Sequence, residues 1–593
     1  MTEPTRVFDL LDLYPKNFGH KSDMYGYKVD GNWKKWSSQE TIEQIYQLAA
    51  GMMENGVKRG DRVGLISSNR PEWNITDFAA QLCGAVLVPV YPNLSETDLA
   101  FVIKDAGLVA FIAEGKVLCD KVNTAVVASG TAVKIVSIDK TEGFESIAQW
   151  CEKGKANPHT QEIEAVKKET TPETLLTLLY TSGTTGTPKG VMLTHRNLVS
   201  NFTILCDLPP VDHTCRVLSF LPLNHIYERM LSYLYLYRGP SIYYAESLEK
   251  VGDNIRELSP HMFTCVPRLV EKVYDRIIAK GEQLTGIKRK LFFWAVELGE
   301  QYDIRPEHRS AWYNFKLSIA SKIIFSKWRE ALGGNVRAMV SGGAALNERL
   351  ARIFWAAGIP ILEGYGLTET SPVIAVNTLE PDSVRFGTVG KVIRNNEVQI
   401  AADGEILVKG PNVMKGYWNR QDATDEVIDA EGWFHTGDIG IFVENRFLKI
   451  TDRKKEIFKT SGGKYIAPQR IENMLNSSRF IEQSMVIGEA QKFASAIVVP
   501  AYGFIRDWAA RKNIKLGETN AEIAANKEVF ARIMQEVEKM NKDLAQYETI
   551  KTVALIAQPF AVDTGELTPK LSLKRKVILK KYEAEFNRIY QES

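Results

Sequence analysis

The sequence has little that would indicate disulfides, a zinc site or a membrane span. Its six cysteines are scattered over 593 residues with no C-x-x-C pair, which argues against a disulfide framework or a cysteine-based zinc site and favours a reducing compartment. No stretch of about 18 apolar residues occurs, and the N-terminus lacks a basic start followed by an apolar core. We therefore expect a cytoplasmic protein that at most lies peripherally on the inner face of a membrane.

An excess of charge of one sign is also absent. Lys and Arg number 74 against 72 Asp and Glu, which leaves a net charge of +2. A protein without a strong overall field has no general attraction for nucleic acid, so we expect no nucleic-acid partner. Internal repeats and low-complexity linkers are lacking as well. A chain of 593 residues nevertheless exceeds what one hydrophobic core usually supports, which predicts at least two domains.

Short apolar runs alternate with helical patterns in the first part of the chain. The runs "DRVGLIS", "VLVPVY" and "LVAFIAE" are separated by amphipathic segments, a pattern typical of βαβ units in a parallel sheet. Residues 270–332 carry aromatics at helical spacing, which predicts a long helical insertion whose aromatic side chains lie in the core. The aromatics of 233–244 are likewise predicted to be core. We expect an α/β fold, with a large N-terminal domain over 1–451 and a small α+β domain over 452–593.

One hydroxyl- and glycine-rich stretch follows a predicted buried strand. "YTSGTTGTPKG", residues 180–190, comes directly after the apolar run "LLTLL". Glycine lets the backbone approach a phosphate closely, hydroxyls and N–H groups can surround its oxygens, and Lys189 adds positive charge. The Walker pattern fails because Pro188 stands at the second glycine position. The stretch alone allows a phosphate cradle or a flexible polar turn.

A second stretch, "EGYGLTET" at 363–370, follows the strand-like "IPIL", and ligands of open parallel sheets bind at such strand ends. Together, "YTSGTTGTPKG", "YGLTETSP", "GWFHTGD" and "DRKKE" resemble the core motifs of the adenylate-forming superfamily. The stretches "SFLPLNHIYERM", "CVPRLVEKVYDRI" and "VSGGAAL" are similar to its long-chain fatty acyl-CoA synthetase branch. The resemblance covers nearly the whole chain and implies the fold of these enzymes.

The resemblance also implies a reaction: ATP-dependent activation of a long-chain fatty acid to acyl-CoA through an acyl-adenylate, with release of AMP and pyrophosphate. ATP, Mg²⁺ and CoA are the implied cofactor and cosubstrates, and a dimer is compatible with the family. Two alternatives stay open, a fatty acyl-AMP ligase that transfers to a carrier protein and a non-catalytic fatty-acid binding or uptake scaffold. Because fatty carboxylate and triphosphate are both anions, the site must neutralise and orient them, and no protein nucleophile is needed.

Residue roles follow from the matching motifs. The implied catalytic residues are Lys574, Glu369, His225, Thr184 and Lys189, with Thr184 and Glu369 as the Mg²⁺ ligands and His225 between the fatty carboxylate and the CoA thiol. Tyr365 would stack on adenine, Asp438 and Arg453 would bind the ribose, and Gly462 and Gly463 would admit the pantetheine of CoA. The full set of expected nucleotide and CoA contacts is Thr181, Ser182, Gly183, Thr185, Gly186, Gly342, Gly343, Ala344, Glu363, Gly364, Tyr365, Gly366, Thr368, Asp438, Arg453, Gly462 and Gly463.

The C-terminal stretch "LTPKLSLKRK", residues 567–576, departs from the family pattern. The related form has Thr at position 570 and Lys at position 572, where this chain has Lys570 and Ser572. We predict Lys574 as the adenylation lysine, with Lys570 as the alternative, and the surrounding basic residues are also suited to a solvated tail or to contact with anionic lipid. By the same resemblance, Lys455 would be the hinge about which the small domain rotates.

Overall fold

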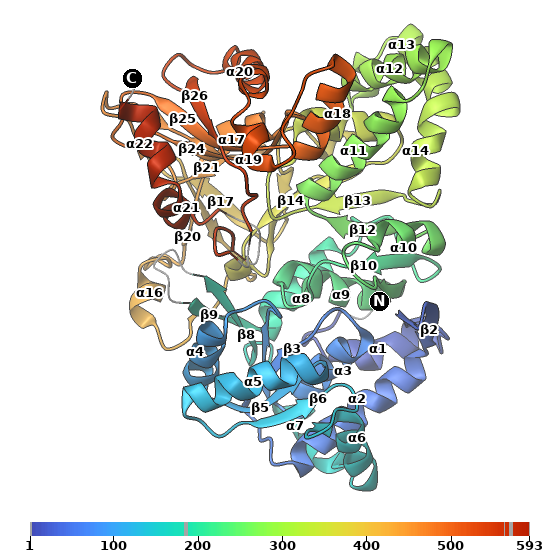
Figure 1. Cartoon of the computed structure of the whole chain (residues 1–593). Helices are drawn as coiled ribbons and strands as arrows, with labels where there is room; N and C mark the ends of the chain where they lie inside the picture. Colours follow the sequence, from blue (N-terminus) through green and yellow to red (C-terminus); the bar gives the residue numbers. More distant parts are fainter. Residues whose placement is uncertain (1–2, 183–187, 562–563, 569–572, 592–593) are drawn as a thin grey trace. The chain divides into compact units, whose positions relative to one another are not determined.

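The computed structural model describes residues 3–182, 188–561, 564–568 and 573–591 (Figure 1). The chain forms two compact units, Met1–Val398 with Leu407–His435, and Gln399–Ile406 with Thr436–Ser593. The predicted combination of a large α/β part and a small α+β part is confirmed. The predicted domain boundary at 451/452 is the expected position of a hinge and not a boundary between compact units. It therefore stays a prediction.

The first sheet of the large unit contains the predicted βαβ pattern. Its strand order is β19-β9-β8-β4-β3-β5-β6-β7, parallel except for the antiparallel pairs of β8 with β9 and of β9 with β19. The strands are β3 (Arg62–Ile66), β4 (Val86–Val90), β5 (Leu108–Ala113), β6 (Lys134–Ser137), β7 (Glu145–Ser146), β8 (Leu175–Ser182), β9 (Pro188–Thr194) and β19 (Gly416–Tyr417). The associated helices are α2 (Ser38–Glu54), α3 (Pro71–Leu82), α4 (Glu96–Ala106), α5 (Gly115–Ser129), α6 (Ile147–Ala156) and α7 (Thr160–Glu169).

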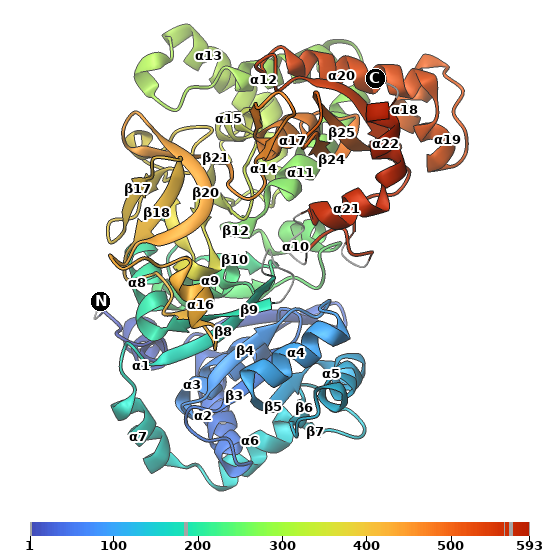
Figure 2. The same ribbon diagram turned by 90° about the vertical axis from the view of Figure 1, so that its left-hand side faces the viewer.

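The second sheet has a parallel centre with antiparallel edges, in the order β16-β15-β14-β13-β12-β10-β11-β1-β2. Its strands are β1 (Tyr25–Val29), β2 (Asn32–Trp36), β10 (Arg216–Ser219), β11 (Ser241–Tyr244), β12 (Met262–Cys265), β13 (Ala338–Ser341), β14 (Ile361–Gly366), β15 (Val373–Val376) and β16 (Lys391–Val392). Strands β14, β13, β12 and β10 of this sheet are labelled in Figure 1, and β12 and β10 also in Figure 2. Helices of this part are α1 (Asp9–Phe18), α8 (His195–Leu205), α9 (Ile226–Arg238), α10 (Val251–Leu258) and α15 (Glu348–Ala356), with short helices η3 (Thr368–Thr370) and η4 (Pro381–Ser383), whereas α16 (Gln421–Asp425) packs against β19 of the first sheet. Tyr233, Tyr235, Tyr237, Tyr243 and Tyr244 are buried, as predicted.

The predicted helical insertion lies between β12 and β13. It comprises α11 (Pro267–Glu282), α12 (Gly286–Glu300), η1 (Pro306–His308), α13 (Ala311–Ala320), the π-helical turn η2 (Ser321–Phe325) and α14 (Ser326–Ala331). Phe292, Phe325 and Trp328 pack in a core cluster with residues of the sheet, as expected. The same expectation is wrong for Trp312 and Phe315, which are exposed. Helical spacing places aromatics on a face, but it does not tell which face meets the core.

A buried ion pair links three elements of the large unit. The guanidinium of Arg229 on α9 donates to Asp77 on α3, with Nη2 to Oδ1 at 2.6 Å and Nε to Oδ2 at 3.0 Å. Its Nη1 also donates to Thr177 Oγ1 on β8 at 2.8 Å. Both charged side chains are fully buried. Because an ion pair away from water needs fixed geometry to offset its desolvation, this contact sets the position of α9 against β8.

The small unit contains a sheet of β24, β25 and β26 covered by helices, and their side chains form its own core cluster. Its elements are β22 (Phe458–Lys459), β23 (Tyr465–Ile466), α17 (Pro468–Asn476), β24 (Ile481–Ile487), β25 (Ala494–Pro500), α18 (Tyr502–Lys512), α19 (Asn520–Ala524), α20 (Lys527–Asn541), β26 (Ile550–Leu555), α21 (Arg575–Lys581) and α22 (Glu583–Gln591). A further sheet, β17-β18-β20-β21, consists of β17 (Glu397–Ile400), β18 (Glu405–Lys409), β20 (Phe434–Val443) and β21 (Phe447–Arg453). The chain therefore passes three times from one unit to the other, at 398/399, 406/407 and 435/436.

Candidate active site

The candidate phosphate cradle begins at the end of a buried antiparallel hairpin. β8 and β9 pair up to the end of the hairpin, with Thr181 opposite Lys189 and Ser182 opposite Pro188. Gly183, Thr184, Thr185 and Gly186 lie outside the described residues. The apolar run of β8 is buried, as expected. The polar stretch 180–190 does not simply follow the strand, however, because β8 continues to Ser182 and β9 begins at Pro188, so both ends of the stretch belong to strands.

Lys189 and Glu369 are brought together by Tyr417, a residue that the sequence reasoning missed. The Tyr417 hydroxyl donates to Glu369 Oε1 at 3.0 Å, and Lys189 Nζ lies 5.0 Å from the centre of the Tyr417 ring. Burial, together with the Glu369 charge, raises the pKa of Tyr417, so its phenol stays protonated and can donate. Only the cluster Gly416-Tyr417-Trp418 could have drawn attention to it, and that is a weak signal.

The carboxyl ends of β13 and β14 present the second predicted group of residues. Gly342, Gly343 and Ala344 follow β13 directly, and Glu363, Gly364, Tyr365 and Gly366 form the end of β14. A Cβ on Gly366 would stand 1.7 Å from the carbonyl oxygen of Pro372, so only glycine fits there. Thr368 and Glu369 follow in η3. The motif therefore lies at the sheet edge where parallel α/β folds bind ligands.

Glu363 is buried at this edge, and its Oε1 accepts a hydrogen bond from the Leu346 N–H at 3.3 Å. Burial raises the pKa of Glu363 to about 8. A carboxyl group in that state is a hydrogen-bond donor at neutral pH, which an ordinary glutamate is not.

His225 occupies the N-cap position of α9. Its Nδ1 accepts a hydrogen bond from the Tyr227 backbone N–H at 3.2 Å, so the neutral imidazole carries its proton on Nε2. Tyr227 donates its hydroxyl to the Val340 carbonyl oxygen at 3.2 Å, and its ring lies next to Gly342. The start of α9 thus lies beside the end of β13, which places His225 at the same sheet edge.

His195 is buried, and its Nδ1 accepts a hydrogen bond from the Val7 N–H at 3.0 Å. Burial lowers the pKa of His195 to about 3. It is a structural histidine.

In the small unit, the two predicted ribose contacts are paired. Asp438 on β20 and Arg453 on β21 stand opposite each other in the ladder, with Arg453 Nε 3.4 Å from Asp438 Oδ1. Asp438 is buried and Arg453 is half-exposed. The contact with Arg453 therefore holds the Asp438 carboxylate in place, while the Arg453 guanidinium reaches solvent. In such a pair the carboxylate can accept hydrogen bonds from two hydroxyls, and the guanidinium can donate to their oxygens.

Two further predicted groups belong to the small unit. Gly462 and Gly463 lie in the exposed turn between β22 and β23, which is closed by a hydrogen bond from the Gly463 N–H to the Thr460 carbonyl oxygen at 2.9 Å. Lys574 directly precedes α21 and is exposed. Its backbone N–H donates to the Glu566 carbonyl oxygen at 2.7 Å. Lys570, the alternative adenylation lysine, lies outside the described residues.

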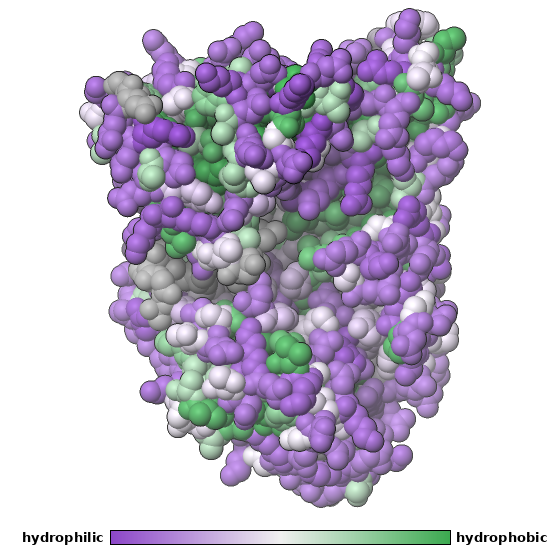
Figure 3. Space-filling model, in the orientation of Figure 1, coloured by the Kyte–Doolittle hydropathy of each residue, from purple (hydrophilic) through white to green (hydrophobic). Residues whose placement is uncertain are grey.

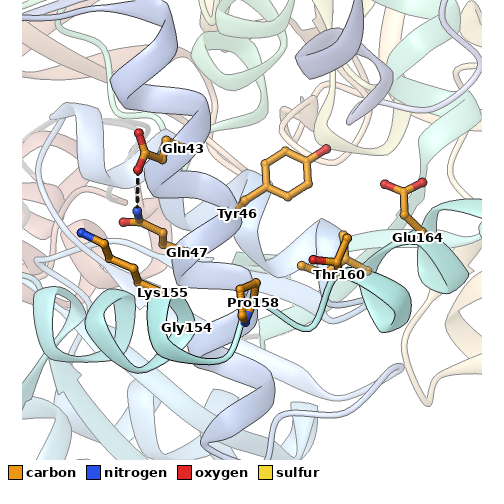
Figure 4. Close-up of a pocket in the computed structure, with 9 residues that line it drawn as sticks. Glu43, Tyr46, Gln47, Gly154, Lys155, Pro158, Thr160 and Glu164 are labelled. Atoms are coloured by element: carbon orange, nitrogen blue, oxygen red, sulfur yellow. Dashed lines mark hydrogen bonds between the residues drawn. The ribbon is translucent and has the colours of Figure 1, made fainter.

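A pocket elsewhere in the large unit contains none of these residues. It has a volume of about 330 Å³ and lies between α2, α6 and α7, with Tyr46, Pro158 and Ile163 among its lining residues (Figure 4). Its polar side chains include Gln47, which donates to Glu43 at 2.9 Å. These polar side chains are exposed or half-buried, so the pocket lacks a buried polar group that would orient a ligand.

Comparison with known proteins identifies the family. Residues 17–418 match the AMP-binding enzyme family, and residues 455–593 match the AMP-binding enzyme C-terminal domain. The chain belongs to the family of AMP-binding enzymes.

The curated relatives are similar over nearly their whole length. The long-chain-fatty-acid--CoA ligase FadD15 of Mycobacterium bovis is 34% identical, and the alignment covers 97% of this chain and 96% of that protein. The peroxisomal long chain acyl-CoA synthetase 7 of Arabidopsis thaliana is 32% identical, with 96% and 86% covered. The predicted resemblance to long-chain acyl-CoA synthetases is confirmed.

Solved structures support the fold. The adenylation domain of a carboxylate reductase from Mycobacterium chelonae matches with a TM-score of 0.76 and 20% identity, covering 99% of this chain and 91% of that one. The anthranilate CoA ligase AuaEII matches with a TM-score of 0.73 and 16% identity, covering 97% of each chain. At these identities the likeness concerns the fold alone.

Proposed function

We propose that this protein is a long-chain fatty acid:CoA ligase, which uses ATP to convert the fatty acid to an acyl-adenylate and transfers the acyl group to CoA, releasing pyrophosphate and AMP. The observation that carries the proposal is the near full-length similarity to relatives that bear this name. The geometry of the large unit supports it, because Lys189, at the start of β9, and Glu369 both contact Tyr417.

The first half-reaction joins two anions. The fatty carboxylate attacks the α-phosphate in line, and the bond to pyrophosphate breaks. Lys189 would neutralise charge on the β- and γ-phosphates, and Lys574 would do so at the α-phosphate. A protein of this kind contributes chiefly orientation and preorganised charge, which requires no covalent enzyme intermediate.

The residues at Glu369 fit a magnesium ion bound together with the triphosphate. Mg²⁺ is commonly held by one or two carboxylates, substrate phosphates and water, and Glu369 is a half-buried carboxylate fixed by Tyr417. Within the described ranges, no group of three or more His, Cys, Asp or Glu residues could form an all-protein metal site. Glu369 and Thr184 would hold the ion, which would supply charge neutralisation of the triphosphate.

In the second half-reaction the CoA thiol attacks the acyl carbonyl and AMP leaves. His225 would lie near the reacting carbonyl. Its Nδ1 caps α9, so the proton of the neutral ring lies on Nε2, on the other side of the imidazole. The turn with Gly462 and Gly463 would admit the pantetheine, since glycine leaves room beside the backbone.

The decisive experiment supplies the full chain with ATP, Mg²⁺, CoA and fatty acids of increasing length, and measures AMP and acyl-CoA. We expect AMP and acyl-CoA in equal amounts, with the highest kcat/KM for long chains. Formation of acyl-adenylate without thioester, followed by transfer to a phosphopantetheinylated carrier protein, would favour the acyl-AMP ligase. Binding of fatty acid without AMP release would favour a scaffold.

A further inference from the structure

One face of the helical insertion exposes large apolar side chains to water. Trp312 is 64% exposed, Phe315 56%, Ile323 44% and Ile319 38%. Their spacing of three, four and four residues puts them on one side of α13 and its continuation η2. We call these four residues the outer face of α13. In Figure 3, apolar surface is visible over the α12 and α13 region that Figure 1 labels.

The opposite side of the same helix is already packed. Tyr313, Ala320 and Phe325 belong to the core cluster of the large unit, and the Tyr313 hydroxyl donates to the Leu298 carbonyl oxygen on α12 at 2.9 Å. The helix is therefore apolar on two sides, although only one side is needed to attach it. A surface helix of a soluble domain ordinarily has a polar outer side, so a second apolar side indicates contact with another apolar phase.

The outer face carries basic charge and no acidic charge. Between Glu307 and Glu330 the sequence has five Lys and Arg residues and no Asp or Glu. Lys316 lies within the outer face, where its Nζ is 5.9 Å from the centre of the Trp312 ring, and Lys322 lies beside Ile323. Trp312 and Phe315 stack with ring centres 5.6 Å apart.

We propose that the outer face of α13, with Lys316 and Lys322, docks the protein on an anionic lipid bilayer. Indole and phenyl rings partition into the interfacial region of a bilayer, and lysines above them contact lipid phosphates while their stems stay on apolar surface. The positive charges of Lys316 and Lys322 complement the negative potential of such a membrane, whereas Lys327 is paired with Glu330 at 2.9 Å. A fluid bilayer also accepts protruding rings without a matching pocket, whereas a protein partner would have to supply one.

This docking surface differs from the basic stretch at the C-terminus that the sequence analysis connected with lipid. The described helices include none that is long and apolar enough to span a membrane, so the docking would be peripheral. It goes beyond the ligase function, and it can be measured without ATP, CoA or fatty acid.

The test is co-sedimentation of the full chain with vesicles of phosphatidylcholine containing phosphatidylglycerol, compared with phosphatidylcholine alone. We expect binding to the anionic vesicles that weakens with salt. Trp312→Gln with Phe315→Gln and, separately, Lys316→Glu with Lys322→Glu should each lower the partition coefficient at least about tenfold. Trp312→Tyr should retain most of the binding, because tyrosine is also amphipathic.

Matched controls are Val117→Gln with Val127→Gln, both exposed on α5, and Lys140→Glu with Lys168→Glu, also exposed. These should bind vesicles like the unchanged protein, and thermal unfolding should confirm that all variants are folded. The proposal is overturned if the α13 variants bind normally, or if only Lys576→Glu with Lys580→Glu loses binding. A change of molar mass in light scattering without a change in vesicle binding would instead assign the outer face to self-association.

Discussion

At the residue scale, Glu369 shows how one carboxylate is fixed from two directions. Its side chain accepts from the Tyr417 hydroxyl, and its backbone carbonyl accepts from the Met414 N–H at 2.8 Å. Both partners come from a segment more than forty residues later in the chain. The position of Glu369 therefore depends on tertiary structure and not on its own motif alone.

Glu369→Gln should leave the protein folded and lower the rate of acyl-adenylate formation by at least about a hundredfold, because a neutral amide is a poor Mg²⁺ ligand. Fatty-acid-dependent pyrophosphate release measures this, with the exposed Glu380→Gln as control. Release at a near-normal rate would remove Glu369 from the metal site.

Glu228 gives a prediction about stability and pH. It is buried on α9 and accepts from Thr264 Oγ1 at 2.5 Å, and burial raises its pKa to about 7. The folded state then retains a proton that the unfolded state loses near pH 4.5, so stability falls as pH rises between these values. Glu228→Gln should match the unchanged protein at pH 4 and exceed it by about 3 kcal/mol above pH 8. Urea unfolding at both pH values measures the difference, and a pH-independent difference would contradict it.

At the scale of elements, the ion pair of Asp77 and Arg229 connects α3, α9 and β8, and thereby the helix that begins at His225 with the strand that leads to the cradle. Asp77→Ala should lower the free energy of unfolding by about 3 to 5 kcal/mol, because it leaves a buried guanidinium without its counter-charge. Adding Arg229→Met should restore part of the loss. Equal unfolding midpoints for Asp77→Ala and the unchanged protein would show that the pair contributes no net stability.

The proposed role of Lys574, directly before α21, in adenylation can be tested by substitution. Lys574→Ala should abolish acyl-adenylate formation and spare the conversion of supplied acyl-adenylate to thioester, because only the first half-reaction needs charge at the α-phosphate. Separate assays of the two half-reactions measure this. If Lys570→Ala gives that result and Lys574→Ala does not, Lys570 is the adenylation lysine.

How far the sequence predicts the structure depends on how local each feature is. The strand before the cradle and the glycines at the end of β14 follow from short patterns, and Gly366 is required by the nearby Pro372 carbonyl. Tyr417 was missed because its partner Glu369 lies 48 residues away. Trp312 and Phe315 were assigned to the core because spacing alone gives no inside or outside.

At the scale of the whole molecule, we propose two roles for the small unit, Lys574 in adenylation and the Gly462–Gly463 turn in thioester formation. One fixed placement can hardly present both to one site, so we predict rotation about Lys455 between the half-reactions. Lys455 lies in a turn closed by a hydrogen bond from the Glu456 N–H to the Arg453 carbonyl oxygen at 2.9 Å.

Lys455→Pro should preserve fatty-acid-dependent pyrophosphate exchange and strongly reduce acyl-CoA synthesis, because proline restricts both its own φ and the preceding residue. Lys455→Ala is the control, since it removes the charge and keeps backbone freedom. Equal loss of both half-reactions in the proline variant would indicate misfolding, and full thioester synthesis would refute rotation at this residue.

The threefold passage of the chain between the units has a consequence for recombination with relatives. Glu405 lies in the short segment 399–406, which belongs to the small unit. Its side chain accepts hydrogen bonds from the Gly437 N–H at 2.9 Å and from Lys454 Nζ at 2.8 Å. A chimera that takes a relative's chain from 452 onward with a single junction would keep Glu405 from one parent and receive position 454 from the other. Exchange of 399–406 together with 436–593 would transfer these partners as one inherited set, so functional hybrids should be recovered more often from the two-segment exchange.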